Sequence, residues 1–236
     1  MDPLFHKDSY IREFLAEVVK TDKSQNAVLL NRSAFYPGGG GQPHDTGWLQ
    51  DQSHKYEITR IQKVGSEIWH IIKSDLPSKG MTVKGILDWD RRYKLMRTHT
   101  AFHILCGVVW RDYKAQVTGG NMEPLKGRMD FEFENLSQGL VHEIEKKVNT
   151  EVQLKRPLFV KILPRSQAFK IPDLIRTKIN LLPENIQEIR VVEIEGLDIQ
   201  ADGGTHVSQT GEVGPVRITE YKSKGKINKR IYIELL

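Results

Sequence analysis

The sequence predicts an α+β fold in which a β-barrel-like N-terminal domain is followed by an α/β sandwich-type domain. Up to residue 88, short strand-like segments alternate with turn residues at hairpin-scale spacing, which is typical of a small barrel. From residue 89 onward, two long helix-like patterns occur among further strand-like segments. This change in character places the boundary between domains 1–88 and 89–236.

The composition excludes several classes of protein. Of the 236 residues, 39% are hydrophobic and 28% are charged, as in an ordinary globular protein. The sequence has no apolar run near the ~20 residues that a membrane-spanning helix needs, and its first residues lack the basic and apolar regions of a signal peptide. The single cysteine, Cys106, excludes an intrachain disulfide and a multi-cysteine zinc finger. We therefore expect a cytoplasmic protein.

The N-terminal elements are short runs rich in β-branched and aromatic residues. The predicted strands cover 26–36, 47–52, 55–64, 67–72 and 81–88. The segment 10–20 is ambiguous, because its apolar residues fit either an amphipathic helix or an alternating strand that enters the barrel. The sequence leaves both interpretations open.

The C-terminal elements begin with a helix over 90–113, whose apolar residues recur at helical spacing. Gly119 and Gly120 end this pattern. A second amphipathic helix covers 136–155, with Ser137 as its N-cap. The remaining predicted elements are strands over 128–135, 157–164, 187–196, 210–225 and 229–235 and a short helix within 166–178.

His99 and His103 form the most distinctive local pattern. Four residues apart on a helix, their imidazoles share one face about 6 Å apart along the axis, and two such neutral imidazoles can bind one zinc ion. Thr100 occupies the position of the glutamate base in the HExxH motif, which argues against a metalloprotease. Cys106 shares this face but lies about 10.5 Å along the axis from His99, so we interpret it as a buried core thiol.

A second segment, residues 201–206, could complete a metal site. Asp202 and His206 offer a carboxylate and an imidazole, and the glycines between them let the loop approach closely. With the helical pair, these residues form a candidate set of four ligands from distant parts of the sequence. The alternative is an ordinary hairpin turn with His206 in a strand, and the residues alone do not decide between the two.

Four consecutive glycines at residues 38–41 mark another unusual segment. Such a run is expected only where the backbone approaches a neighbour closely or takes a positive φ. It is not a Walker loop, because no Lys-Ser/Thr follows, and not a Rossmann fingerprint, because a proline replaces the third glycine. A flexible hairpin loop is the alternative, but Phe35, Tyr36, Gln42 and Asp45 could anchor the loop against a neighbouring site.

The charge distribution permits a phosphate-rich partner. The chain has 35 Lys and Arg against 30 Asp and Glu, which gives a net charge of +5. Five of the basic residues cluster between Tyr221 and Arg230. This cluster is either a solvated hairpin turn or a nucleic-acid contact, and both interpretations stay open.

Five motifs in order resemble those of the alanyl-tRNA editing family, which comprises the editing region of alanyl-tRNA synthetases and the free-standing AlaX proteins. Residues 35–47 match the family pattern FYPxxGGQxxDxG, and residues 99–105 resemble HTAxHLL. The other matches are residues 127–131 with RxDF, 202–207 with CGGTHV and 210–214 with TGEIG. The resemblance covers nearly the whole chain. Because no aminoacylation domain precedes the motifs, it implies the free-standing form.

The resemblance also implies a site. It predicts one zinc ion per chain, with His99, His103, Asp202 and His206 as ligands, and places Thr100 and Asp202 among the catalytic residues. The implied substrate-binding residues are Gly39, Gly40, Gly41, Gln42 and Asp45. In the synthetases a cysteine occupies the position of Asp202. A carboxylate keeps the negative charge but is a harder, weaker zinc donor, so Asp202 either ligates the ion or orients a zinc-bound water.

The implied activity is hydrolysis of the ester that joins a wrong amino acid to tRNA(Ala), chiefly serine, with glycine as a second candidate. No Glu or His adjoins the ligands as an obvious general base, so we expect the ion mainly to position the aminoacyl group. Two alternatives remain at this point. The protein could be a tRNA-binding module with a structural metal site, or a metal-dependent hydrolase of another ester.

Overall fold

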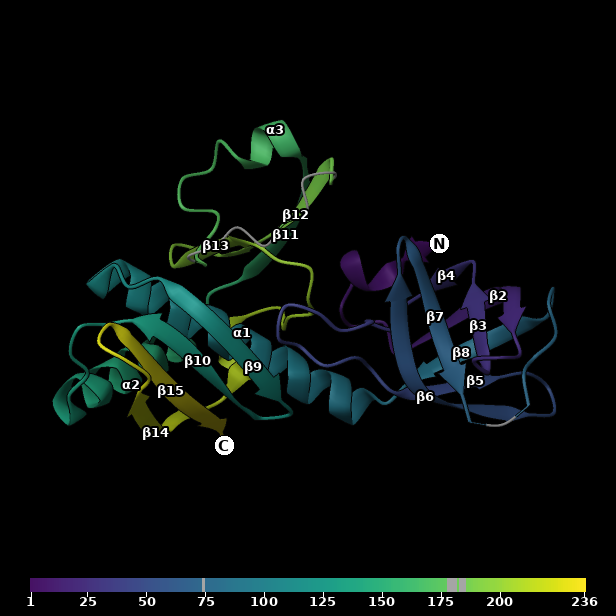
Figure 1. Ribbon diagram of the computed structural model, residues 1–236, viewed down its shortest axis with the longest axis horizontal. Coiled ribbons are helices and arrows are strands. Elements are labelled where there is room, and N and C mark those ends of the chain that lie inside the picture. Colours follow the sequence, from purple (N-terminus) through teal and green to yellow (C-terminus); the bar gives the residue numbers. More distant parts are fainter. Residues whose placement is uncertain (74, 178–181, 183–185) are drawn as a thin grey trace. The chain divides into compact units, whose positions relative to one another are not determined.

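A computed structural model describes residues 1–73, 75–177, 182 and 186–236 (Figure 1). The chain divides into two compact units, Met1–Lys94 and Leu95–Leu236. The predicted boundary after residue 88 falls at the start of helix α1 (Trp89–Tyr113), which begins in the first unit and ends in the second. In the described part of the chain, no helix is long and apolar enough to cross a membrane.

The first unit contains a closed, antiparallel, six-stranded barrel with the order β2-β3-β7-β6-β5-β8, which confirms the predicted α+β class with an N-terminal barrel. Closure gives each of these strands two neighbours and removes the open edges of a sheet. The barrel strands are β2 (Glu13–Asp22), β3 (Ala27–Leu30), β5 (Gly47–Gln50), β6 (Lys55–Val64), β7 (Glu67–Ile72) and β8 (Thr82–Leu87). A separate parallel pair consists of β1 (Asp2–Pro3) and β4 (Arg32–Ser33), and the 3-10 turn η1 (Leu4–His6) follows β1.

Strand β2 resolves the ambiguous segment 10–20. Phe14, Ala16 and Val18 are buried in the barrel core, whereas Leu15 between them is 65% exposed. Pairing with β3 and β8 satisfies the backbone of β2, so the period of two prevails over the helical interpretation. The ring of Phe14 meets that of Phe35 edge-to-face in the core, with centroids 5.6 Å apart.

The second unit contains two antiparallel sheets, with the orders β14-β15-β10-β9 and β11-β12-β13. The strands of the first sheet are β9 (Val117–Glu123), β10 (Lys126–Glu132), β14 (Val216–Ser223) and β15 (Asn228–Leu235). Those of the second are β11 (Leu158–Pro164), β12 (Glu188–Ile194) and β13 (Asp198–Ala201). The shorter helices are α2 (Gln138–Gln153), α3 (Arg165–Ala168) and the 3-10 helix η2 (Thr210–Val213).

The predicted helices of the second unit are present. Ser137 caps α2 as expected, because its hydroxyl accepts a hydrogen bond of 3.2 Å from the backbone N–H of Leu140. Helix α3 supplies the short helix expected within 166–178, a range whose last residue lies outside the described residues. The agreement is incomplete, because β9 and β13 were not predicted and residues 210–213, which were placed in a strand, form the 3-10 helix η2.

Helix α1 lies between the two sheets of the second unit (Figure 1). On one side Phe102 fills the space above Gly127 of β10, where a Cβ atom would lie only 2.6 Å from the ring. On the other side a Cβ on Gly107 would lie 2.9 Å from Leu197 and 3.0 Å from Asp198. Since glycine has no side chain at either position, α1 can approach β10 on one side and the turn before β13 on the other. This packing brings the start of β13 against the helix.

A buried histidine in the barrel leads to a prediction about pH. His70 is fully buried; its Nδ1–H donates to the Val28 carbonyl at 3.3 Å, and its Nε2 accepts from the Ser33 hydroxyl at 2.8 Å. Burial lowers the pKa of His70 from 6.5 to about 4. Since the pKa is lower in the folded state, the stabilisation is complete above pH 6.5 and is lost as the pH falls from 6.5 toward 4.

We therefore expect this group to remove roughly 3 kcal/mol from the free energy of unfolding between pH 7 and pH 4. Urea unfolding across this pH range, compared between the wild type and His70→Gln, isolates its contribution from that of the carboxylates. The variant should show a flatter pH dependence, and parallel curves for the two proteins would contradict the prediction.

Candidate metal centre

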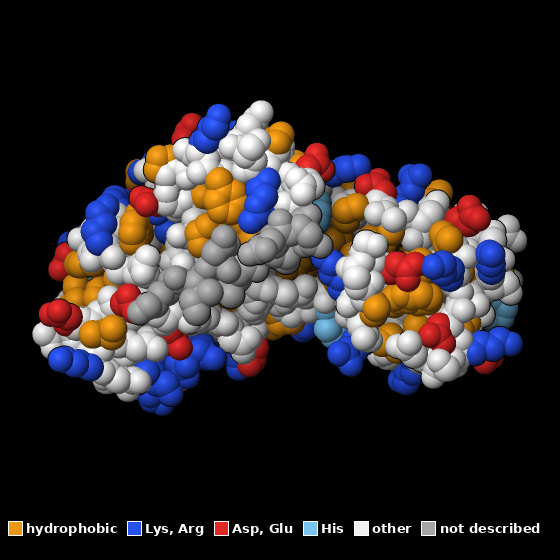
Figure 2. Space-filling model, turned by 45° about the horizontal axis from the view of Figure 1, so that its top comes forward, with side chains coloured by type: hydrophobic (Ala, Val, Ile, Leu, Met, Phe, Trp, Pro, Cys, Tyr) orange, Lys and Arg blue, Asp and Glu red, His pale blue; other side chains and the backbone are white. Residues whose placement is uncertain are grey.

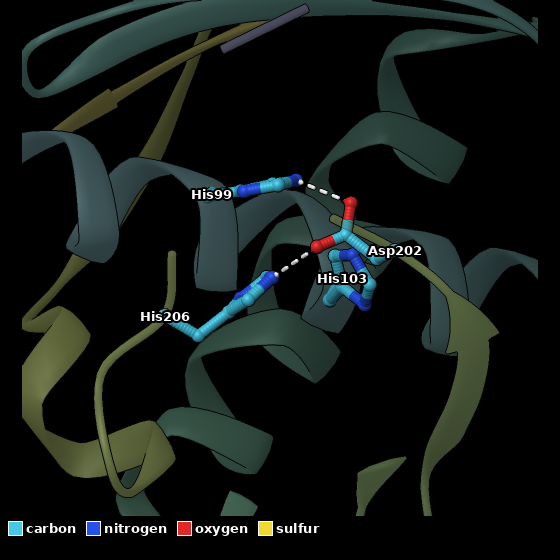
Figure 3. A group of neighbouring side chains, drawn as sticks. All are labelled: His99, His103, Asp202 and His206. Atoms are coloured by element: carbon cyan, nitrogen blue, oxygen red, sulfur yellow. Dashed lines mark hydrogen bonds and ion pairs between the residues drawn. The ribbon is translucent and has the colours of Figure 1, made fainter. Parts of the chain in front are cut away.

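Four side chains predicted as ligands gather at one place in the second unit (Figure 3). His99 and His103 come from α1, and Asp202 and His206 come from the loop that follows β13. One nitrogen or oxygen of each lies within 4.8 Å of the corresponding atom of the others. The helix and the glycine-containing loop, which are about a hundred residues apart in sequence, therefore meet at a cluster of four donors.

The three imidazoles form a compact group. His99 and His103 are one helical turn apart, with ring centroids separated by 5.2 Å. The ring of His206 stacks on that of His99 at 4.2 Å and meets His103 edge-on at 4.6 Å. All three residues are buried, with at most 5% of their surface exposed. His206 lies in a loop, so the alternative in which it is a strand residue of a hairpin is wrong.

The Asp202 carboxylate bridges the Nε2 ends of the His99 and His206 rings (Figure 3). Its Oδ2 is 2.9 Å from His206 Nε2, and its Oδ1 is 3.5 Å from His99 Nε2. In a tetrahedral zinc site with bonds of ~2.0–2.1 Å, neighbouring donor atoms are ~3.3 Å apart, so both separations suit donors that share one ion. The backbone N–H of Gly204 also donates to Oδ2 at 2.8 Å, which fixes the carboxylate.

The protonation states of His99, His206 and Asp202 favour metal binding, whereas the pKa of His103 is raised, because the neighbouring Asp198 carboxylate outweighs the effect of burial. Burial lowers the pKa of His99 to about 4 and that of His206 well below its ordinary value. Burial alone would raise the pKa of Asp202, but its contacts with His99 and His206 hold that pKa well below the usual range. At neutral pH, two neutral imidazoles thus face an ionised carboxylate, which is a donor set that a divalent ion requires.

Thr100 contacts the side of His206 away from Asp202. Its Oγ1 lies 3.1 Å from His206 Nδ1 and accepts a hydrogen bond of 3.3 Å from the backbone N–H of Val207. Thr100 is completely buried, and its hydroxyl contacts a candidate metal ligand, His206. Its catalytic role stays a prediction.

Two further residues at the cluster were not singled out from the sequence. Arg190 on β12 donates from Nη1 to the Asp202 carbonyl at 2.9 Å, and this nitrogen is 3.7 Å from the Asp202 carboxylate. Asp198 at the start of β13 lies 3.2 Å from His103 Nδ1. In the sequence, Arg190 and Asp198 are each only a charged residue within an apolar strand pattern. Such a residue is by itself expected to be exposed, so the pattern does not reveal that they lie at the site.

Cys106 lies outside the donor cluster. It is buried, and burial raises the pKa of its thiol well above the ordinary value. A thiol that stays protonated is a poor metal ligand and a poor nucleophile. The interpretation of Cys106 as a core residue agrees with this environment.

The glycine-rich segment lies in the first unit. Gly38, Gly39, Gly40 and Gly41 all have positive φ, between +57° and +131°, which explains why four glycines occur in succession. Backbone hydrogen bonds join Gly39 and Gln42 in both directions, so Gly40 and Gly41 form a tight two-residue turn.

Polar residues after this turn are buried. Gln42 and Asp45 are 2% and 1% exposed. The carboxylate of Asp45 accepts a hydrogen bond of 2.6 Å from the backbone N–H of Tyr36. It also accepts from Nε of Arg92, at 2.9 Å to Oδ1 and 3.0 Å to Oδ2. The predicted contacts of Gly39, Gly40, Gly41, Gln42 and Asp45 with a substrate stay predictions.

Comparisons with known proteins identify the family of the chain. Residues 189–232 match the family model for the threonyl and alanyl tRNA synthetase second additional domain, and residues 8–91 match that for tRNA synthetases class II (A). The chain is 38% identical to the alanyl-tRNA editing protein AlaX-M of Saccharolobus solfataricus, over 98% of this chain and 97% of the relative. AlaX-M of Methanosarcina acetivorans is also 38% identical, over 99% and 98% of the two chains.

The alanine–tRNA ligase of Ignicoccus hospitalis is 38% identical over 91% of this chain, but the match spans only 24% of the ligase. The barrel, the donor cluster and these relatives together define the class of alanyl-tRNA editing domains. Within this class, the chain belongs to the AlaX-M family of alanyl-tRNA editing proteins, whose members it matches over nearly their full length.

Proposed function

We propose that the protein is a trans-editing aminoacyl-tRNA deacylase, an ester hydrolase that removes a wrong amino acid from tRNA(Ala). Serine is the chief amino acid removed, with glycine as a second. The observation that carries this proposal is the buried cluster of three imidazoles and one carboxylate in a chain of the AlaX-M family. A tRNA substrate also suits the predicted cytoplasmic location.

The residues of the cluster suit zinc. His99, His103, Asp202 and His206 would hold the ion, because imidazole and carboxylate donors are common in zinc sites. When bound, zinc would polarise or position the aminoacyl group. Thr100 contacts His206, Asp198 lies beside His103, and Arg190 holds the loop that carries Asp202. The role of the chain itself is therefore to fix the donors in a buried, pre-formed arrangement.

Selectivity would come from reading the serine hydroxyl. A site that hydrogen-bonds this hydroxyl discriminates strongly against alanine, whereas one that merely tolerates it cannot. Gly39, Gly40, Gly41, Gln42 and Asp45 are the proposed substrate-binding residues, since their segment matches the family motif. This discrimination would leave correctly charged Ala-tRNA(Ala) intact.

One observation favours a second candidate function. The cluster offers four protein donors, and zinc sites closed by four protein ligands are usually structural. The protein would then be a tRNA-binding module whose metal supports the fold. In that case Asp202 would fill the position that an active site leaves open.

A deacylation assay separates these functions. Purified protein is incubated with Ser-tRNA(Ala), Gly-tRNA(Ala) and Ala-tRNA(Ala), with and without a chelator, and its metal content is measured. We expect rapid loss of serine, slower loss of glycine, little loss of alanine and inhibition by the chelator. Binding of tRNA without deacylation would support the structural alternative, and hydrolysis of simple esters but not of Ser-tRNA(Ala) would indicate another hydrolase.

The tip of the β14–β15 hairpin supports an RNA partner. Basic and acidic side chains are intermixed on the face that Figure 2 shows. In the sequence, residues 221–233 include five Lys and Arg and no Asp or Glu. Lys222 pairs with Glu220 at 2.8 Å, and Arg230 pairs with Asp130 at 2.7 Å. In the described part of the chain, Lys224 and Lys226 have no acidic partner, so their charges are available for phosphates.

The double variant Lys224→Glu/Lys226→Glu is therefore expected to raise the KM for Ser-tRNA(Ala) and leave kcat nearly unchanged. The slope of log affinity against log salt should become shallower by roughly 0.7–0.9 per lost phosphate contact. Lys63→Glu/Lys79→Glu, which changes two exposed lysines of the first unit, is the matched control. Equal losses in both double variants would reduce the effect to net charge and contradict the prediction.

A further inference from the structure

Asp198 is a fully buried carboxylate that contacts a candidate metal ligand. Its side chain has no exposed surface, and its Oδ2 lies 3.2 Å from Nδ1 of His103. We propose that Asp198 is a positioning residue for the metal centre, which holds His103 in the tautomer and orientation that metal binding requires. The inference rests on the proposed function in taking zinc as the ion.

The contact determines which nitrogen of His103 can bind a metal. A neutral imidazole has one N–H donor and one acceptor nitrogen, and a metal needs the acceptor. With Nδ1 facing the Asp198 carboxylate, the proton is favoured on Nδ1, and Nε2 remains as the donor atom. Nδ1 has no well-aligned hydrogen-bond partner among the described residues, so Asp198 is the group that compensates this buried N–H.

Asp198 is itself held by two other donors. Gln200 Nε2 donates to Oδ2 at 2.6 Å, and Arg176 Nε donates to Oδ1 at 3.3 Å. Arg176 is also buried, so the pair supplies the opposite charge that a buried carboxylate needs. Because His103, Gln200 and Arg176 are all hydrogen-bond donors, both side-chain oxygens at this position act as acceptors.

The other two imidazoles are fixed in a comparable way. His206 directs Nε2 to Asp202 and Nδ1 to the Thr100 hydroxyl. His99 directs Nε2 to Asp202 and also hydrogen-bonds to the backbone of Thr205. Each ligand thus has a second partner in the protein, and Asp198 is the charged member of this set. Such outer partners typically change metal affinity by 10–100-fold when removed.

The test is zinc affinity, measured by competition with a chromophoric chelator on the full chain without tRNA. Asp198→Asn preserves the shape but presents an amide N–H to one of the three donors. We expect its zinc affinity to fall 10–100-fold. Imidazole nitrogen NMR of the zinc-free proteins should show the Nδ1–H tautomer of His103 in the wild type and a shift toward Nε2–H in the variant.

A second variant guards against misfolding of the first. Gln200→Ala removes the 2.6 Å hydrogen bond to Asp198 but leaves the carboxylate in place, and it should reduce zinc affinity to a smaller extent. The matched control is Asp173→Asn. Asp173 also lies near Arg176, at 3.7 Å, but it is exposed and is not paired with His103.

We expect Asp173→Asn to bind zinc like the wild type. Wild-type zinc affinity and an unchanged His103 tautomer in folded Asp198→Asn would overturn the inference. Since this assay uses no tRNA, a wild-type protein that binds zinc but does not deacylate Ser-tRNA(Ala) would contradict the proposed function alone.

Discussion

The variant His103→Ala is expected to lose zinc binding and, with it, deacylation of Ser-tRNA(Ala). It removes one of three imidazoles in a cluster whose donor atoms lie within 4.8 Å of one another. Loss of an outer partner already costs 10–100-fold in metal affinity, so loss of a ligand should reduce deacylation by more than about 100-fold. Metal content and single-turnover deacylation, measured on the same preparation, test both parts of the expectation.

Cys106→Ala provides the control for this variant. Cys106 lies on the same helix, three residues beyond His103, and is buried but outside the donor cluster. Its replacement should leave zinc content and deacylation near the wild-type level. Full activity in His103→Ala, or in protein from which the metal has been removed, would show that the cluster does not serve the reaction.

The candidate ligands could be predicted because their spacing is a local property of the sequence. His99 and His103 are four residues apart on a helix, and glycines between Asp202 and His206 free the loop backbone. That the two segments meet is a tertiary property, and it depends on contacts such as that of Gly107 with the turn before β13. The family resemblance supplied this part of the prediction.

The residues that hold the ligands could not be predicted in the same way. Asp198 and Arg190 occur in strands where a charged side chain normally faces solvent. Asp198 pairs with Arg176, which belongs to a segment outside the β12–β13 hairpin, and Arg190 lies opposite Asp202 across that hairpin. The side-chain contacts that bury these charges leave no period in the sequence.

Strand β2 illustrates a similar limit in the fold. Its apolar residues fit two periods, and Leu15, which a helix would have buried, is mostly exposed. The barrel favours the strand, because only a strand can form backbone hydrogen bonds with both β3 and β8. Local propensity therefore fits both a helix and a strand for this segment, and closure of the barrel selects the strand.

The second large effect is expected at the glycine-rich segment, where Asp45→Ala should destabilise the first unit by about 3–5 kcal/mol. Asp45 and Arg92 form an ion pair with almost no exposed surface, and Arg92 also donates to the carbonyls of Ser9 and Ala34. Removing the carboxylate leaves a buried guanidinium without its counter-charge. Urea unfolding of the variant and the wild type measures the loss.

Two further variants identify its cause. Glu57→Ala, which breaks an exposed ion pair with Lys73, should change the free energy of unfolding by at most about 1 kcal/mol. In the double variant Asp45→Ala/Arg92→Met, much of the loss should be recovered, because no unpaired charge remains. Additive losses in the double variant would contradict the ion pair as the source of stability.

The same variants separate the structural role of Asp45 from its predicted contact with substrate. Its carboxylate already accepts hydrogen bonds from Arg92 and Tyr36, and the latter bond fixes the backbone just before the four glycines. If Asp45 acts through this loop, the folded fraction of the double variant should deacylate Ser-tRNA(Ala) with a raised KM and a nearly normal kcat. If Asp45 contacts the reacting group, kcat should fall even where the fold is restored.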